Sequence, residues 1–340
     1  MGTGPVAGVD YPATYQQLLK WFPDDDSCVE YLARLRWPDG FVCPACDGGQ
    51  FWRTGRGLWM CRSCSRGTSV TAGTIFHRTR TPLSTWFAAI WFVTSQKNGV
   101  SALGLQRVLG FGSYQTAWAW LHKLRRAMVR PDRDRIGGPG TVVELDETLI
   151  GGVSGGTMGG YADKVPVMIA VELDPSATSG SRTRAGRPSR RQVRLGRVRM
   201  QVAQRPNTVD LLVFAQAVIE PGTTIRTDGA TILKRLPDHG FKHEPTNGYA
   251  ATDPATVLPG VHLVASLLKR WFIGTLHYRV EVQQLPYYLD EYTFRFNRRG
   301  AKSRGLLFYR LLQQAVGTDP NPLHQLLKPH EQQAESSNWC

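Results

Sequence analysis

The stretch Thr141–Gly152 has the sequence TVVELDETLIGG, and the rest of the chain can be interpreted around it. Its valines, leucines and isoleucine favour a buried strand. Three carboxylates, those of Glu144, Asp146 and Glu147, nevertheless lie within it. A carboxylate in apolar surroundings is costly unless a positive group pairs with it, and a divalent ion that prefers oxygen ligands, such as Mg²⁺, is one such group. Taken alone, the stretch also fits an edge strand with solvated acids.

A second stretch with a carboxylate at its end favours the metal interpretation. Thr223–Ala230, TTIRTDGA, is a short β-prone run in which Asp228 stands directly before a glycine. If Asp146 and Asp228 lie near each other, their oxygens offer ligands for a pair of ions about 3.5–4 Å apart, the arrangement that activates the attacking oxygen and stabilises the leaving oxygen in phosphodiester chemistry.

A third candidate ligand is His262, in the segment VHLVASLLKRW. This segment predicts a helix over 262–272. His262, Ser266 and Lys269 then share one face, because residues spaced i, i+4 and i+7 align on a helix. The sequence therefore predicts that a histidine and a lysine share a groove with the two aspartates. The alternative for His262 is a satisfied histidine in the core.

Composition indicates the class of partner. The chain has 340 residues and a formal net charge of +14, which favours a polyanionic partner. We find no run of 18 or more apolar residues, so no membrane span is expected. The N-terminal sequence MGTGPVAGVDYPATY lacks a basic region followed by an apolar core, so we expect no secretory signal and a cytoplasmic, nucleoid-associated protein.

Four of the six cysteines form two CxxC pairs, CPAC and CRSC. Four thiolates from two tight turns satisfy a tetrahedral Zn²⁺, so residues 41–70 are predicted to form a structural zinc ribbon with the ligands Cys43, Cys46, Cys61 and Cys64. A redox pair is the alternative, but it lacks the βαβ context of such motifs. Exposed arginines would give the ribbon a basic surface: Arg53, Arg56, Arg62 and Arg66.

Residues 82–130 predict an all-helical domain. Helices are expected over 82–95, 101–109 and 114–130, and a glycine-containing turn joins the last two. Two helices joined in this way, the second one basic, suggest a DNA-binding helix-turn-helix. The alternative is a helical hairpin with a solvated basic face. The side chains expected to face outward from the last helix are Lys123, Arg125, Arg126 and Arg130.

From residue 140 the pattern is that of an α/β domain with a mixed sheet and flanking helices. We expect strands over 141–149, 165–173, 196–202 and 223–227 and near 241, and helices over 208–219, 230–236, 262–272, 285–298 and 306–316. The predicted domains are 1–80 (helices and zinc ribbon), 81–135 (helix-turn-helix), 140–318 (α/β domain) and 319–340 (polar tail).

An insertion at 174–199 interrupts the α/β domain. It carries eight arginines and no acid between Arg182 and Arg199. Such a segment is expected to be disordered when free and to become ordered on phosphates, which arginine binds bidentately; a solvated hairpin loop is the alternative. The arginines expected to contact DNA are Arg182, Arg184, Arg187, Arg190, Arg191 and Arg194.

Together these motifs resemble a known family, the bacterial insertion-sequence transposases with a zinc ribbon, a helix-turn-helix and a ribonuclease-H-like catalytic domain. The resemblance covers nearly the whole chain. It rests on the following sequences: CPAC and CRSC, GVSALGLQRVLGFGSYQTAWAWLHKLR (Gly99–Arg125), VELDETLIGG, RTDGA, LLKRWFIGTLH and YLDEYTFRFNRR.

The resemblance implies a catalytic set. Asp146 and Asp228 would be the first two metal ligands, and His262 would occupy the third position, which varies among Glu, Asn and His in this family. Lys269 would contact DNA near the cut. Leu263, Val264 and Ala265 stand where the family pattern has Asn-Thr and aromatic residues, and Asp290 or Glu291 is an alternative third acid.

The resemblance also implies a DNA transposase that uses Mg²⁺ or Mn²⁺. It would bind the terminal inverted repeats of its element, cut at the element ends and join the released 3′-hydroxyls to target DNA as a dimer or higher oligomer. An inactive DNA-binding regulator and a nuclease of the same fold are the alternatives. Besides the arginine-rich insertion, the residues expected to contact DNA are Tyr114, Lys123, Arg125, Arg126 and Arg270.

Overall fold

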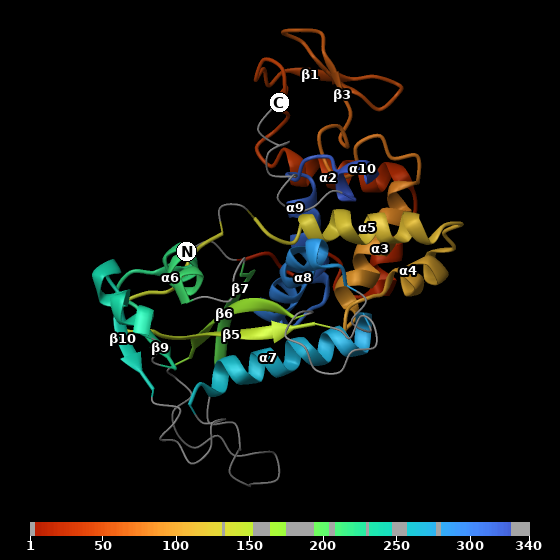
Figure 1. Ribbon diagram of the computed structural model, residues 1–340. Helices are drawn as coiled ribbons and strands as arrows, with labels where there is room; N and C mark the ends of the chain where they lie inside the picture. The colour runs from red at the N-terminus through yellow and green to blue at the C-terminus, as the bar shows by residue number, and fades with distance from the viewer. Residues whose placement is uncertain are drawn as a thin grey trace. The chain divides into compact units, whose positions relative to one another are not determined.

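The structure of the chain is a computed structural model, in which two compact units are distinguished (Figure 1): Pro131–Arg299, and Met1–Arg130 together with Gly300–Cys340. It describes residues 4–130, 133–151, 164–174, 194–203, 208–228, 231–246, 257–276 and 280–327. Within these ranges no helix has the length and apolar character that crossing a membrane requires.

The unit 131–299 is built on a five-stranded mixed sheet with the order β10-β9-β5-β6-β7. β5, β6 and β7 are antiparallel neighbours, whereas β9 runs parallel to β5, and β10 runs parallel to β9. The α/β class expected from the sequence is therefore confirmed. β5 lies in the middle of the sheet, which excludes the edge-strand alternative. The strands are β5 (Val142–Ile150), β6 (Val165–Leu173), β7 (Leu195–Val202), β9 (Thr224–Thr227) and β10 (Lys242–Pro245).

Both faces of this sheet are covered. Side chains alternate along a strand; accordingly, Ile169 of β6 packs in one core cluster with α7 and α8, and Ala170 packs in another with α6 and η3. Burial on both faces explains why β6 is almost continuously apolar. The covering elements are α6 (Thr208–Val218), the 3-10 helix η3 (Thr231–His239), α7 (Pro259–Trp271), the π-helical η6 (Phe272–Leu276) and α8 (Leu285–Asn297).

Smaller elements complete this unit, namely the parallel pair β4 (Ile136–Gly137) and β8 (Ile219–Glu220) and the 3-10 turn η7 (Val282–Gln284). The helix predicted over 230–236 is instead the 3-10 helix η3. Pro237 lies inside it, and proline removes a backbone donor that a regular α-helix needs.

The other unit is mostly helical. Ser101 accepts a hydrogen bond from the Gly104 amide and begins α4, which ends at Gly110 in the left-handed conformation (φ 67°). Its helices are α1 (Tyr15–Trp21), α2 (Asp25–Arg36), α3 (Leu83–Ser95), α4 (Ala102–Leu109), α5 (Tyr114–Arg126), α9 (Gly305–Ala315) and α10 (Leu323–Leu326). A three-stranded sheet also belongs to this unit and consists of β1 (Phe51–Arg53), β2 (Trp59–Cys61) and β3 (Gly67–Thr68).

The helix predicted near 306–316 belongs to the helical unit, although the sequence placed it in the α/β domain that ends at 318. In the structure α9 packs against α2 and α3, and the ring of Phe308 lies 5.7 Å from that of Phe87. Gly305 permits this approach, because a Cβ there would lie 1.8 Å from the carbonyl oxygen of Pro12. The apolar face of α9 therefore completes the helical core.

The basic end of α5 is not the open surface expected from the sequence. Arg125 is only 2% exposed, and Lys123 and Arg126 are half-buried. The ammonium of Lys123 lies 6.0 Å from the centre of the Trp86 ring, and Arg126 donates to the side chain of Asn321. Long basic side chains bury their apolar stems in this way. The expectation that all three face outward is therefore wrong.

The link between α2 and α3 gives a first prediction. α3 has no side-chain cap of its own, and Asp25 of α2 accepts hydrogen bonds from the Leu83 and Ser84 amides at 2.9 and 3.0 Å. Asp25→Ala should lower the free energy of unfolding by about 1–2 kcal/mol, as loss of a helix cap does. Urea unfolding at neutral pH, followed by far-UV circular dichroism, measures this. Asp26→Ala, at an exposed position in the same turn, is the control, and an equal loss in both variants would contradict the assignment.

Candidate active site

Strand register places the two predicted aspartates side by side. β5 and β9 pair in parallel, with Val142 opposite Thr224 and Glu144 opposite Arg226. Two residues further along these strands are Asp146 and Asp228. Paired residues on parallel neighbours point to the same face of a sheet. The charge of Asp228 raises the pKa of Asp146, which agrees with this placement.

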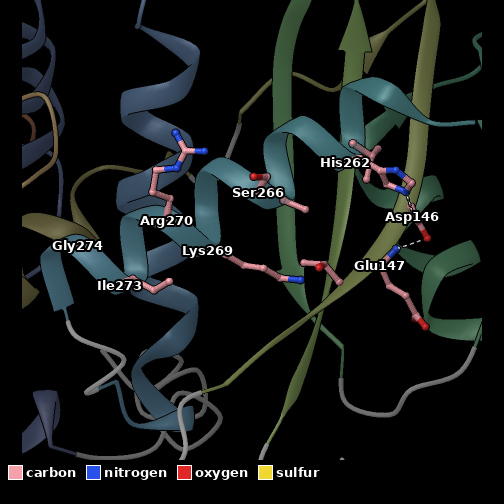
Figure 2. A pocket seen from close by; sticks show the side chains of 11 residues that line it. Asp146, Glu147, His262, Ser266, Lys269, Arg270, Ile273 and Gly274 are labelled. Carbon is pink, nitrogen blue, oxygen red and sulfur yellow. Dashed lines mark hydrogen bonds and ion pairs between the residues drawn. The ribbon is translucent and has the colours of Figure 1, made fainter. Parts of the chain in front are cut away.

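Helix α7 brings the predicted histidine to the same face. The Nε2 atom of His262 lies 3.6 Å from Oδ2 of Asp146, and the side chains are 43% and 21% exposed. The Glu147 amide donates to the other carboxylate oxygen of Asp146 at 2.8 Å. Figure 2 shows the imidazole pointing at the aspartate across the space between helix and strand. His262 is therefore not a satisfied histidine in the core.

The electrostatics of Asp146 disfavour its charged form. Burial raises the pKa of its carboxyl group to about 6; the charges of Asp228 and Glu147 add to this, whereas the hydrogen bond from the Glu147 amide and the proximity of His262 oppose it. A carboxylate with a raised pKa, beside a second carboxylate, is a site that a cation would stabilise.

A groove of about 720 Å³ opens along α7 from Asp146. The predicted alignment of His262, Ser266 and Lys269 is present in the structure, because all three side chains line this groove (Figure 2). Arg270, exposed on the same helix, lines it too. The other lining residues are Glu147, Thr148, Val261, Ala265, Ile273 and Gly274.

The sequence did not single out Thr148, Ile273 or Gly274 as lining residues. Extending the predicted helical face by one further turn would have found Ile273, since it lies at i+11 from His262. Thr148 lies two residues beyond Asp146 on the same strand, where the period-2 pattern turns it to the same face.

The alternative third acids do not lie at this site. Glu291 is 1% exposed and accepts two hydrogen bonds from Arg295, at 2.9 and 2.8 Å. Burial raises the pKa of Asp290 to about 7, a shift that the charge of Arg133 opposes. Neither residue lines the groove. Of the candidates from the sequence, His262 therefore remains as the third group.

The residues predicted to contact DNA differ in their surroundings. Tyr114, at the start of α5, is 53% exposed. Arg194 pairs with Asp174, with Nε and Oδ2 3.3 Å apart. The remaining arginines named for the insertion lie outside the described residues: Arg182, Arg184, Arg187, Arg190 and Arg191.

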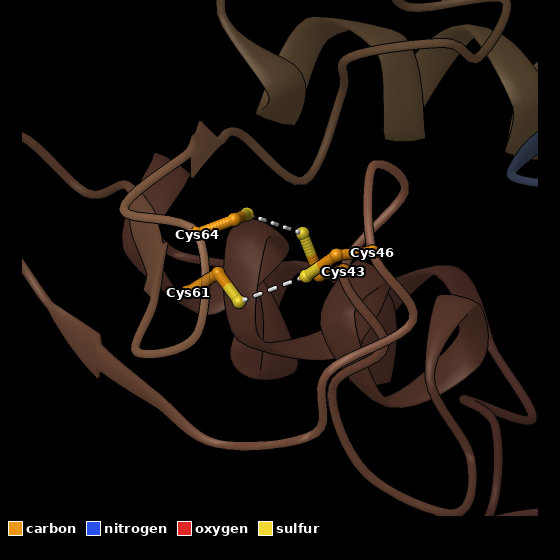
Figure 3. Close-up of side chains that lie close together, drawn as sticks. All are labelled: Cys43, Cys46, Cys61 and Cys64. Atoms are coloured by element: carbon orange, nitrogen blue, oxygen red, sulfur yellow. Dashed lines mark hydrogen bonds between the residues drawn. The ribbon is translucent and has the colours of Figure 1, made fainter.

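The four predicted zinc ligands form a compact cluster. Their sulfur atoms all lie within 4.8 Å of one another, and the Cys43–Cys64 and Cys46–Cys61 pairs are each 3.6 Å apart (Figure 3). Tetrahedral zinc with Zn–S bonds of about 2.3 Å separates its ligands by roughly 3.8 Å, so the cluster fits a structural Zn²⁺. Hydrogen bonding, chiefly from the Cys64 amide, lowers the pKa of Cys61 to about 6, which favours the thiolate that binds zinc.

The candidate ligands around Asp146 are less compactly arranged for a divalent ion than the four cysteines are for zinc. Among the described residues, the four cysteines are the only group of three or more candidate ligands compact enough to hold one ion. Atoms 3.6 Å apart, as in the pair Asp146–His262, can share an ion held at about 2.1 Å from each. Asp228 is exposed at the end of β9, and it would have to move toward Asp146 to join them.

Comparison with known families gives two matches. Residues 137–297 match the ISXO2-like transposase domain, and residues 23–67 match a transposase zinc-ribbon domain. The chain is also 26% identical over 174 residues to an uncharacterized protein in the transposable element ISH50 of Halobacterium salinarum. The matched region covers 45% of this chain and 57% of that relative.

The cysteine cluster predicts one zinc ion per chain. Cys43→Ser and Cys61→Ser should lose the ion, because three thiolates hold zinc less tightly than four. Elemental analysis of the purified protein measures the zinc content. Cys28→Ser is the control, since Cys28 is buried outside the cluster. Stoichiometric zinc in the Cys61→Ser protein would contradict the assignment.

The raised pKa of Asp146 predicts a pH-dependent stability. In the fold this pKa is about 6, above the ordinary 3.8, so the ionised carboxylate destabilises the fold above pH 6, and protonation relieves this as the pH falls. In buffer without added Mg²⁺, Asp146→Asn should be more stable than the wild type at pH 7.5 by about 1–3 kcal/mol.

Urea unfolding across pH 4.5–8 measures this difference. It should shrink as the pH falls through 6. A wild type as stable as Asp146→Asn at pH 7.5, or a gap that widens in acid, would contradict the explanation.

Proposed function

Because this chain belongs to the insertion-sequence transposases with an ISXO2-like transposase domain, we propose that it binds the terminal inverted repeats of its element, cuts at the element ends and joins the released 3′-hydroxyls to target DNA. The observation that carries this proposal is the position of Asp146, beside Asp228 and 3.6 Å from His262, at one end of a groove lined by Lys269 and Arg270.

Each group at the site has a proposed role. Asp146, Asp228 and His262 hold divalent ions, Mg²⁺ or Mn²⁺. Bound there, the ions supply activation of the attacking oxygen and stabilisation of the leaving oxygen. The protein itself aligns the DNA backbone: Lys269 and Arg270 donate to non-bridging phosphate oxygens, since both are cationic donors facing the groove. The raised pKa of Asp146 shows that its ionised form is disfavoured in these surroundings, so a bound cation would stabilise it.

The topology supports a ribonuclease-H-like assignment for the catalytic unit. Three antiparallel strands are followed by two parallel ones on the opposite edge, and helices cover both faces. The candidate acids follow from this order: one lies on the first strand of the sheet along the chain, and the other directly follows the parallel neighbour of that strand. This order supports the proposal that Asp146 and Asp228 act as strand-borne metal ligands.

The helical unit is proposed to bind the terminal repeats. α4, the turn at Gly110 and α5 form two helices joined by a short glycine-containing turn, as in a helix-turn-helix. The start of α5 is the exposed end, and we assign DNA contact to Tyr114 there rather than to the buried Arg125. The exposed arginines of the zinc ribbon would add phosphate contacts: Arg53, Arg56, Arg62 and Arg66.

The arginine-rich insertion is proposed to bind the DNA backbone as well, since its residues 182–199 carry eight arginines and no acid. Joining requires two element ends held together, so the working form on DNA is proposed to be a dimer or larger. These functions imply that the protein works in the cytoplasm, on the nucleoid.

A cleavage and strand-transfer assay tests the proposal. The substrate is a duplex carrying the inverted repeat that flanks the gene, with Mg²⁺ and a target plasmid. The wild type should give nicked and joined products. Asp146→Ala and Asp228→Ala should fall to the level of the reaction without divalent ions, because the carboxylates that hold the ions are lost. Glu220→Ala, at an exposed strand position outside the groove, is the control.

The alternatives appear as distinct outcomes of this assay. Nicked product that is never joined would identify a nuclease. Specific binding without any cleavage by the wild type would identify a regulator. Full activity of Asp146→Ala would place the chemistry elsewhere.

A further inference from the structure

We propose that Glu144 is a positioning residue that fixes the start of α7 and thereby holds His262 beside Asp146. The inference rests on the proposed function, because it assigns the residue that assembles the site proposed for metal binding. Glu144 does not line the groove and is only 1% exposed; it would therefore act through its neighbours.

The start of α7 has no cap of its own. Its N-cap residue, Leu258, makes no side-chain hydrogen bond, and Pro259 carries no amide hydrogen. The next amides are among the donors that a helix leaves without an intrahelical partner. The Val261 amide donates to Oε2 of Glu144 at 2.8 Å, and the Gly260 amide also bonds to this carboxylate. A residue of β5 thus supplies the missing cap from the neighbouring strand.

Gly260 shows that this contact is close. A Cβ at this position would lie 2.8 Å from Oε2 of Glu144 and 2.9 Å from the Cδ2 atom of Leu173. Real Cβ atoms essentially never show such separations, so a larger residue would force the Glu144 carboxylate, the Leu173 side chain or the helix start to shift. A glycine at the second position of α7 thus lets the carboxylate approach the backbone directly.

These hydrogen bonds from the start of α7 to Glu144, hereafter called the clamp, lie next to the candidate site on both elements. On β5, Glu144 and Asp146 are two residues apart and point to the same face of the sheet. On α7, Val261 directly precedes His262. Two contacts therefore join the same strand to the same helical turn, Glu144 to Val261 at 2.8 Å and Asp146 to His262 at 3.6 Å. Because both connecting segments are regular structure, a shift of the helix start alters the second distance directly.

Charge and geometry can be separated by choice of variant. A carboxylate near a helix N-terminus is favoured by the helix dipole, and it would also attract a cation through space. Glu144→Gln keeps the acceptor oxygen and removes the charge, whereas Glu144→Ala removes both. Gly260→Ala leaves the charge intact and disturbs the contact between the carboxylate and the helix start. The matched controls are Glu220→Ala, exposed on β8, and Gly300→Ala, where a Cβ meets open space.

The first experiment is amide hydrogen exchange of the full-length protein without added divalent ions. In Glu144→Ala, exchange of the segment 258–264 should be at least about tenfold faster, the factor expected for loss of a charge-assisted hydrogen bond. Gly260→Ala should show the same local change, Glu144→Gln a smaller one, and the two controls none. Unchanged protection of these amides from exchange in both Glu144→Ala and Gly260→Ala would overturn the proposal that Glu144 fixes the start of α7.

The second experiment is a double-mutant cycle on Mn²⁺ binding, with the metal alone as the probe. Glu144→Ala should raise the dissociation constant for Mn²⁺ about 10–100-fold, as loss of an outer-shell partner does. In a His262→Ala background, Glu144→Ala should raise the dissociation constant by no more than about twofold. A residue that acts by positioning His262 has no further effect once that imidazole is absent.

The outcomes distinguish a positioning role from the other roles. An equal loss with and without His262 would show that Glu144 supports the fold alone. A loss in Glu144→Gln as large as in Glu144→Ala would show that it acts through its charge. Both results would overturn the proposal. A wild type that binds no Mn²⁺ would instead refute the proposed function, and hydrogen exchange would still decide whether the clamp exists.

Discussion

The parallel register between β5 and β9 is the constraint on which the candidate site of the unit 131–299 depends. It sets Asp146 and Asp228 at the same level on neighbouring strands. Burial raises the pKa of Asp146 to about 6, and the charge of Asp228 adds to the effect. The fold therefore sets two carboxylates on neighbouring strands, where a bound cation would stabilise their charges. A one-residue slip of β9 would turn Asp228 to the opposite face.

In both units, the start of one helix is capped by a side chain from another element. Asp25 caps the start of α3 from α2, and Glu144 caps the start of α7 from β5. In each case the capped helix lacks a side-chain cap of its own. A cap supplied by another element joins two elements at a defined point and satisfies orphan amides at the same time. In the unit 131–299 that point lies beside the residues of the proposed site.

Much of this architecture follows from local sequence patterns, and the rest depends on long-range packing. The strands around Asp146 and the face of α7 that carries His262 are periodic features, so the sequence predicts them. Periodicity cannot tell which core an amphipathic helix joins, and α9 was assigned to the wrong domain for this reason. Nor can it show that Arg125 is buried. Glu144 was noticed only as a carboxylate, because its partner, Val261, lies far away in the sequence.

The proposed chemistry requires that Asp146 and Asp228 hold divalent ions together. The most direct measurement is the anomalous scattering of Mn²⁺ in crystals of the protein bound to a terminal-repeat duplex. We expect Mn²⁺ between the carboxylates of Asp146 and Asp228, with His262 among the ligands of one ion. Manganese bound elsewhere, with these two carboxylates directed away from it, would contradict the claim.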